Sequence, residues 1–298
     1  MLLHYETGLI GVESLVHDSS FFFSSQGRVN PEAELIATIE AFYRTPESQC
    51  KFPARKLWLD QQLRFPSFPE VNCADYQNYK QAFDAESISL VYASGYLGNP
   101  ASMYGHILLK FNNPENHEYL DNTFSYGARV PETDNKLTYI FQGITGGYEG
   151  FYANQKYHHQ NLTYSESELR DLWEYRLNLS EQDVTFVLAH LWELENVSMT
   201  YYFFTENCAY QLAKLLELVI DDPLVVKNKR WVMPYDVIMM LNNASEGNYI
   251  DEIIYHGSRQ EHLYNRFKQL DHDEKVSVQN ITERHGLCCL IRLEDMAA

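Results

Sequence analysis

Hydrophobic residues recur at helical spacing in the first part of the chain. Asn30 and Pro31 form a typical helix start, and an apolar face with a period of three to four residues follows them. Residues 53–64 and residues 75–83 have the composition of two further helices. We therefore expect residues 1–84 to be a helical lead-in that packs on a core.

The pattern changes at Ile88, where short apolar runs separated by glycine, asparagine and proline predict strands. The predicted strands cover residues 88–94, 105–111 and 119–126. A short helix over residues 137–141 and a glycine- and aromatic-rich segment follow. That segment lacks the glycine spacing of a nucleotide-binding loop.

Helical spacing returns at Ser165, with capping-box patterns at Ser165 and at Ser180. We predict helices from both serines, another over residues 208–220, and one that begins after Pro234. The remaining tail, residues 246–298, is mixed and charged, and we interpret it as an extension with a strand or two and a helix.

Composition restricts the partners of this 298-residue chain. A net charge of -18 excludes a nucleic-acid-binding protein of the usual basic kind, and it disfavours electrostatic docking on anionic lipid. Contact with a membrane surface would therefore need apolar or aromatic side chains. No apolar stretch reaches the roughly 18 residues of a spanning helix. The first residues lack the features of a signal peptide and resemble the interior of a protein whose leader has been removed, so the natural chain can extend further at either end.

Four of the five cysteines give no indication of a metal site. Cys50 and Cys73 lie in polar segments and enclose a modest loop, so a disulfide is expected in an oxidising compartment. Adjacent Cys288 and Cys289 have poor geometry for a metal, and no cysteine or histidine cluster has zinc spacing. We expect no metal and no cofactor.

Cys208 is the strongest candidate for chemistry. It follows the aromatic run that ends in Glu206 and Asn207, and it begins an apolar periodic segment, so Asn207 is a plausible helix cap. A thiol at a helix N-terminus has a lowered pKa and can act as a nucleophile. The alternative is a small buried cysteine, which is common in protein cores.

His106 is the candidate base for Cys208. It lies in an otherwise apolar strand after a loop rich in glycine and serine, although a lone strand histidine is more often a packed residue. A strand with a histidine followed by a helix with a cysteine is the reverse of the papain order, which predicts an α+β fold with a circularly permuted papain-like core. Asn122, on the next strand, is the first choice to orient the imidazole, and an edge asparagine is the equal alternative.

The substrate would meet several groups around this pair. We expect the oxyanion near the Cys208 backbone N–H, with help from the loop that contains Ser102 and Tyr104, and Asn207 adjoins the same place. Tyr148 and Tyr152 could line an apolar groove beside the thiol, although core packing is the commoner role for any one aromatic residue. Glu206 is expected to stabilise the helix dipole, because a carboxylate beside a thiolate would raise the pKa of the thiol.

Several separated motifs together resemble the Lnb N-terminal periplasmic domain family. The motifs are Ser102-Met103-Tyr104-Gly105-His106, Gly146-Gly147-Tyr148-Glu149-Gly150, Arg170-Asp171-Leu172-Trp173-Glu174-Tyr175 and Phe203-Phe204-Thr205-Glu206-Asn207-Cys208-Ala209-Tyr210. The segments that begin at Asn30 and Cys50 resemble a lead-in of the same family, and the likeness extends from about Leu2 to at least Pro234.

The resemblance implies a permuted papain-like, NlpC-related thiol fold in the bacterial periplasm or on the outer face of the inner membrane. It also implies transfer of an acyl chain from a phospholipid or diacylglyceryl ester, through a Cys208 thioester, to the α-amino group of a lipoprotein's N-terminal cysteine. His106 would then be the base and acid, and a lyso-form lipoprotein would remain. Family members can carry a membrane-embedded C-terminal region, and we expect none within these 298 residues. The expected divisions are the lead-in, a catalytic core over residues 85–245, and the extension over residues 246–298.

Two other functions fit the same residues. An NlpC-type cysteine amidase or peptidase would cut cell-wall peptides in a narrow polar cleft. An inactive binding module would keep Cys208 as a structural residue only.

Overall fold

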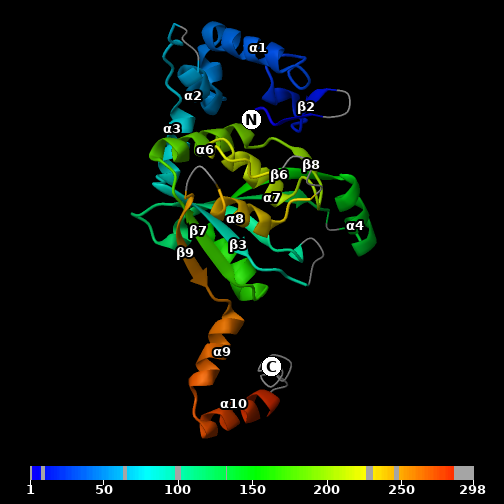
Figure 1. The fold of residues 1–298 in the computed structure, drawn as a ribbon, viewed down its shortest axis with the longest axis vertical. Helices are drawn as coiled ribbons and strands as arrows, with labels where there is room; N and C mark the ends of the chain where they lie inside the picture. Colours follow the sequence, from blue (N-terminus) through cyan, green and yellow to red (C-terminus); the bar gives the residue numbers. More distant parts are fainter. Residues whose placement is uncertain are drawn as a thin grey trace.

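The fold is taken from a computed structural model, which describes residues 2–7, 11–62, 66–97, 102–131, 133–225, 231–244 and 248–284. Figure 1 shows three parts along the long axis of the molecule. The N-terminal lead-in is at one end, a sheet flanked by helices is in the middle, and two C-terminal helices form an arm at the other end.

The centre of the molecule is a seven-stranded sheet in which every neighbouring pair is antiparallel. The strand order is β8-β6-β5-β4-β3-β7-β9. The strands are β3 (Ser87–Ala93), β4 (His106–Asn112), β5 (Asn122–Arg129), β6 (Tyr148–Lys156), β7 (Leu172–Leu177), β8 (Met199–Tyr201) and β9 (Ile250–His256). Together with the helices, this sheet confirms the expected α+β class.

Both faces of the sheet are covered, which explains the nearly continuous apolar run in β4. On one face, α6 (Glu181–Leu194) contacts β3, and α7 (Cys208–Leu216) contacts β4 and β5. Alternate residues of β4 face this main core, while Leu108 between them packs in a smaller cluster on the opposite face. The short α5 (Tyr157–Asn161) and the turn after it supply that smaller cluster. α8 (Pro234–Asn242) packs against α7.

The lead-in contains the three predicted helices and a small additional hairpin. The hairpin joins β1 (Tyr5–Thr7) to β2 (Val12–Ser14). The helices are α1 (Pro31–Arg44), α2 (Pro53–Gln62) and α3 (Ala74–Phe83). The expected helix start of α1 is confirmed.

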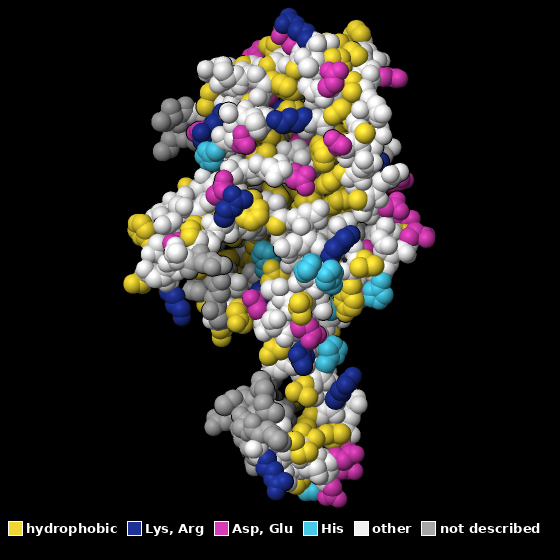
Figure 2. Space-filling model, turned by 180° about the vertical axis from the view of Figure 1, so that it is seen from behind, with side chains coloured by type: hydrophobic (Ala, Val, Ile, Leu, Met, Phe, Trp, Pro, Cys, Tyr) yellow, Lys and Arg dark blue, Asp and Glu magenta, His cyan; other side chains and the backbone are white. Residues whose placement is uncertain are grey.

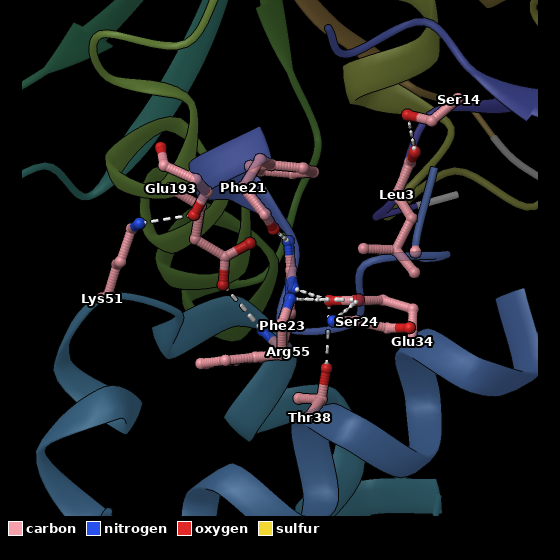
Figure 3. Close-up of polar contacts among 12 residues, drawn as sticks. Leu3, Ser14, Phe21, Phe23, Ser24, Glu34, Thr38, Lys51, Arg55 and Glu193 are labelled. Carbon is pink, nitrogen blue, oxygen red and sulfur yellow. Dashed lines mark hydrogen bonds and ion pairs between the residues drawn. The ribbon is translucent and has the colours of Figure 1, made fainter. Parts of the chain in front are cut away.

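Covalent and polar contacts fasten the lead-in to the core. The predicted disulfide joins Cys50 to Cys73, and the Trp192 indole on α6 donates to the Cys50 carbonyl at 2.9 Å. Arg55 on α2 is buried, and its guanidinium donates to the Glu34 carboxylate at 2.9 Å, while its backbone N–H donates to Glu193 on α6 at 2.9 Å (Figure 3). A buried network therefore spans α1, α2 and α6.

The network continues from Glu193 into two buried histidines. His190 Nδ1 lies 3.0 Å from Glu193, and the His190 and His4 rings approach at 2.9 Å between their Nε2 atoms. Burial, together with the nearby Arg55, lowers the pKa of His190 to about 3, and burial raises the pKa of Glu193 to about 7. Burial also lowers the pKa of His4, so both histidines are neutral over the physiological range.

The prediction of a helix from Ser165 was wrong. A π-helical turn over Leu162–Ser167 is followed by strand β7, in which Leu172 and Glu174 both point inward. The sequence pattern favoured a helix because a glutamate such as Glu174 is expected on an exposed face, not inside a strand. In the fold its carboxylate is buried against the Lys110 ammonium at 3.0 Å.

Other boundaries shifted by smaller amounts. The third predicted strand begins later, at Asn122, because a short 3-10 turn over Glu118–Leu120 precedes it. Residues 250–256, which the sequence placed in the extension, form the edge strand of the sheet beside β7. The arm beyond them is α9 (Arg259–Gln269) and α10 (His272–Arg284). Within the described ranges, no helix combines the length and the hydropathy needed to cross a membrane.

Candidate functional site

Cys208 is the first residue of α7, as the sequence predicted. Its side chain is 5% exposed, and it is the free cysteine among the described residues. Backbone N–H groups of Ile107, Ala209 and Cys208 itself lie close enough to the sulfur to favour its thiolate form. Because Ile107 follows His106 directly, the thiol lies beside the start of strand β4.

Burial has a stronger effect on this thiol than the helix terminus. Desolvation raises the pKa of Cys208 to about 11, although the three N–H groups and the charge of Arg170 act in the opposite direction. The helix start does lower the thiol pKa, but burial outweighs it, so the expected net lowering is wrong. The resting side chain is a neutral thiol at physiological pH.

His106 lies at the first position of β4, on the sheet face that carries Leu108. Its ring packs against Tyr164 at 5.8 Å between centroids. Burial and the positive charge of Arg170 lower the pKa of His106 to about 4. A neutral imidazole can accept a proton, which is the state that a general base needs.

Two residues that the sequence analysis did not select complete the surroundings of His106. Arg170 is buried and donates to the carbonyls of Ala93 and Ser94 at the end of β3, at 2.9 and 2.5 Å. Its guanidinium carbon lies 4.8 Å from the centre of the Tyr164 ring. The charge of Arg170 acts on both His106 and Cys208. The Arg170 motif was noted for its family likeness, but nothing local in the sequence indicates that it reaches the site.

Asn122 does not lie beside His106. In the antiparallel register of β4 and β5, Asn122 is opposite Phe111, five residues along the strand from His106, which is roughly 16 Å. The Asn122 amide instead donates to the Ala82 carbonyl at 3.2 Å. The prediction that Asn122 orients the His106 imidazole is therefore wrong. His106 and Asn122 each begin their strand, and antiparallel pairing places the beginnings of β4 and β5 at opposite ends of the pair.

Asn207 holds the nucleophile segment in place. Its side-chain oxygen accepts from the Tyr210 N–H at 3.1 Å, which confirms the predicted helix cap. Its amide donates to the carbonyls of Phe203 and Val232, at 3.1 and 2.9 Å. These contacts use both ends of the buried amide, and they support a scaffold role in place of the expected contact with substrate.

The tyrosines expected to line a groove are buried packing residues. The Tyr148 hydroxyl donates to Asp134 at 2.6 Å, and the Tyr152 hydroxyl donates to the Gln211 carbonyl at 3.1 Å. Tyr104 is 45% exposed in the loop before His106. The Ser102 carbonyl in the same loop accepts from the Gly105 N–H at 3.0 Å and shapes the turn.

Three further polar groups lie in or near the segment that carries Cys208, where the Tyr126 ring stacks on Tyr201 at 5.6 Å. Burial, with the nearby Glu6, raises the pKa of Glu206 to about 7, so part of it is protonated at neutral pH and its repulsion of a thiolate is weaker. Gln211, one helical turn after Cys208, and Tyr126 are buried, and neither the Gln211 amide nor the Tyr126 hydroxyl has a hydrogen-bond partner in the described part of the chain. A buried polar group without a hydrogen bond destabilises the folded state, so the Gln211 amide and the Tyr126 hydroxyl can hydrogen-bond to water or to a ligand.

Two cavities in the described part of the chain lie away from Cys208. One, of about 690 Å³, is between the lead-in and the core and has Trp58, Phe186 and Val219 among its lining residues. Another, of about 730 Å³, lies beside the disulfide. The wide apolar groove expected next to the thiol is neither of these. Among the described residues, no group of histidine, cysteine or carboxylate side chains could hold a metal ion.

Comparison with known families gives two matches. Residues 75–244 match the model of the Lnb N-terminal periplasmic domain, and residues 1–62 match a domain of unknown function (DUF7843). The first 62 residues of the lead-in therefore match a family model separate from that of the core, although their motifs resembled the same family, and α3 falls within the Lnb model. No curated protein and no solved structure gives a significant match.

The family match covers more than half of the chain and includes both His106 and Cys208. A periplasmic location follows from the family, and the disulfide agrees with an oxidising compartment. The chain belongs to the Lnb N-terminal periplasmic domain family.

Proposed function

We propose that the protein is a thiol acyltransferase of the cell envelope with a permuted papain-like, NlpC-related core, and that it works at the outer face of the inner membrane. The observation that carries the proposal is the position of Cys208. Its sulfur lies at a helix N-terminus and close to the backbone N–H groups of Ile107 and Ala209, and Ile107 directly follows the neutral His106 in the chain. The family match supports the placement in the envelope.

The first half-reaction moves an acyl chain onto the protein. As the Cys208 sulfur attacks the carbonyl carbon of a glycerolipid ester, the thiol proton passes to His106. The backbone N–H groups of Ile107 and Ala209 stabilise the negative charge on sulfur and on the oxyanion. His106 then returns the proton to the departing glycerol oxygen, which leaves a Cys208 thioester and a lyso-lipid.

The second half-reaction moves the chain to an amine. The α-amino group of a lipoprotein's N-terminal cysteine attacks the thioester, His106 accepts one amine proton, and the Cys208 sulfur leaves and regains a proton. The products are an N-acyl amide and the free thiol. When the donor ester belongs to the same lipoprotein, the product is a lyso-form lipoprotein.

Concerted proton transfer fits the resting ionisation of this pair. With the Cys208 pKa at about 11 and the His106 pKa at about 4, an ion pair is not the stable resting state. A thiol that stays neutral until an ester carbonyl is in place avoids a permanently buried charge. Arg170 then favours the thiolate as it forms, because it lowers the thiol pKa through its charge.

The burial of the Cys208 side chain favours a second candidate function, an inactive binding module in which Cys208 is a structural core residue. A cysteine amidase that cuts cell-wall peptides would use the same first step with an amide as substrate. The experiment that separates these functions is mass spectrometry of lipoprotein N-terminal peptides from cells that depend on this protein for N-acylation.

We expect N-acylated peptides with the wild type and unacylated peptides with Cys208→Ala or His106→Ala. His262→Ala is the matched histidine control, because His262 is exposed on α9 in the arm. Normal N-acylation by a folded Cys208→Ala variant would refute the proposed nucleophile. Unacylated lipoproteins with the wild type, together with release of cell-wall peptides, would favour the amidase.

A further inference from the structure

Helix α4 (Lys136–Thr145) presents an unusually apolar outer face. Leu137 is 80% exposed and Phe141 is 68% exposed, and Ile140 and Ile144 are exposed beside them. These four positions follow the i, i+3, i+4, i+7 spacing that places side chains on one face of a helix. Gly143 is the buried residue of this helix, so the face that would normally enter a core points to solvent.

The opposite side of α4 is held firmly against the segment that leads to Cys208. The Phe203 N–H donates to the Gly143 carbonyl at 2.8 Å, and the Phe203 and Tyr139 rings are 4.9 Å apart. A Cβ on Gly143 would lie 2.2 Å from the Phe203 ring, so the close approach needs glycine. Asn135 caps the helix start by accepting from two backbone N–H groups.

The contacts continue from Phe203 to the nucleophile. The Phe203 and Tyr201 rings are 5.9 Å apart, and the Tyr201 hydroxyl accepts a hydrogen bond from the Cys208 backbone N–H. The Asn207 amide donates to the Phe203 carbonyl at 3.1 Å. The exposed face of α4 and the reacting sulfur are therefore positioned by one packed block of side chains.

The charge of α4 differs from that of the chain as a whole. Lys136, which is exposed, is the one charged residue of the helix, whereas the chain has a net charge of -18. Lys136 directly precedes Leu137, so its ammonium group can meet lipid phosphates while the apolar side chains enter the acyl region. Figure 2 shows hydrophobic side chains projecting at the left-hand margin, where α4 lies in that view.

We propose that α4 is an interfacial anchor that inserts Leu137, Ile140, Phe141 and Ile144 into a phospholipid bilayer. The inference deepens the proposed function, on which it rests, because the bilayer holds the ester that Cys208 would attack. A bilayer suits this convex face better than a peptide, since the surface is a helix ridge whose apolar residues project separately.

The test is co-sedimentation of the protein with vesicles of phosphatidylethanolamine and phosphatidylglycerol. We expect the Leu137→Ser, Phe141→Ser double variant to bind at least about tenfold more weakly than the wild type, with an unchanged melting temperature because both side chains are exposed. The matched control is Val29→Ser, Ile36→Ser, which removes two exposed apolar side chains from the lead-in. Its vesicle binding should equal that of the wild type.

The outcomes separate docking from chemistry. Cys208→Ala should bind vesicles like the wild type, so failure of acyl transfer alone leaves the anchor supported. Equal vesicle binding by the α4 variant and the wild type would overturn the anchor, even if acyl transfer from detergent-dispersed lipid continued. Sedimentation velocity is the second measurement: a wild-type dimer that the α4 variant converts to a monomer would also overturn it, because a second copy would then cover the face.

Discussion

Replacing Asn207 by alanine removes three hydrogen bonds from the segment that positions Cys208. The Asn207 oxygen accepts from the Tyr210 N–H, and its amide donates to the carbonyls of Phe203 and Val232. The side chain is buried, so water does not readily replace the lost partners. We expect a measurable loss of stability and a misplaced thiol.

The size of the loss follows from these contacts. Loss of an N-cap costs about 1 kcal/mol, and each buried carbonyl that loses its donor costs about 1 kcal/mol. The free energy of unfolding should therefore fall by about 3 kcal/mol. With an unfolding entropy of about 2.1 cal/mol/K per residue, that corresponds to a fall of about 5 °C in melting temperature for this chain.

The assay is thermal and urea unfolding, with Asn207→Asp as the matched variant. Aspartate keeps the oxygen that caps α7 but turns its second carboxylate oxygen toward the Phe203 and Val232 carbonyls, so its loss of stability should be at least as large as that of alanine. An Asn207→Ala protein that melts like the wild type would refute the scaffold role. If the same protein showed only a raised KM, Asn207 would instead be a substrate contact.

Three other perturbations test separate parts of the structure. Cys50→Ser should lower the free energy of unfolding by about 3 kcal/mol, which is the entropic contribution expected from the loop that the Cys50–Cys73 disulfide closes. Urea unfolding like that of the wild type under oxidising conditions would contradict this contribution. Glu34→Ala should destabilise the protein by about 3–5 kcal/mol because it leaves the buried Arg55 guanidinium without its carboxylate, whereas a change below about 1 kcal/mol would show that the pair is dispensable. Arg170→Met should raise the pKa of His106, because a nearby positive charge opposes protonation of the ring. The acid limb of the pH–rate profile, where activity is lost as pH falls, would then move to higher pH, and an unmoved limb would contradict the electrostatic role.

Much of the local structure could be predicted from the sequence because its causes are local. The Asn30, Ser180 and Asn207 caps each bond a backbone N–H three residues later, so a few neighbouring letters are enough to predict them. The sheet strands also follow from short apolar runs between turn residues. The predicted disulfide needed only two cysteines in suitable surroundings.

Long-range pairing decided what the sequence could not show. Glu174 lies on the inner face of a strand because Lys110, on another strand, neutralises it, and this made the predicted helix wrong. Asn122 was placed near His106 by sequence proximity, but the strand register separates them. Arg170 reaches the candidate site only because β7 pairs beside β3. Each of these outcomes depends on pairing between strands that the local sequence does not specify.

The pKa of Cys208 was mispredicted for a related reason. The helix terminus and its N–H groups were correctly expected to lower it, but the desolvation that outweighs them depends on the packing around α7. Sequence patterns predict the cap and the apolar periodicity of such a helix. They do not give the depth at which its first residue is buried.

The central claim is that Cys208 carries the acyl chain as a thioester. Its most direct test is the intact mass of the protein after incubation with phospholipid vesicles in the absence of an amine acceptor. The account predicts a mass increase of one acyl chain that maps to Cys208, is removed by neutral hydroxylamine, and is absent from Cys208→Ala. An unchanged mass in the folded, vesicle-bound wild type, or an equal adduct on Cys208→Ala, would contradict it.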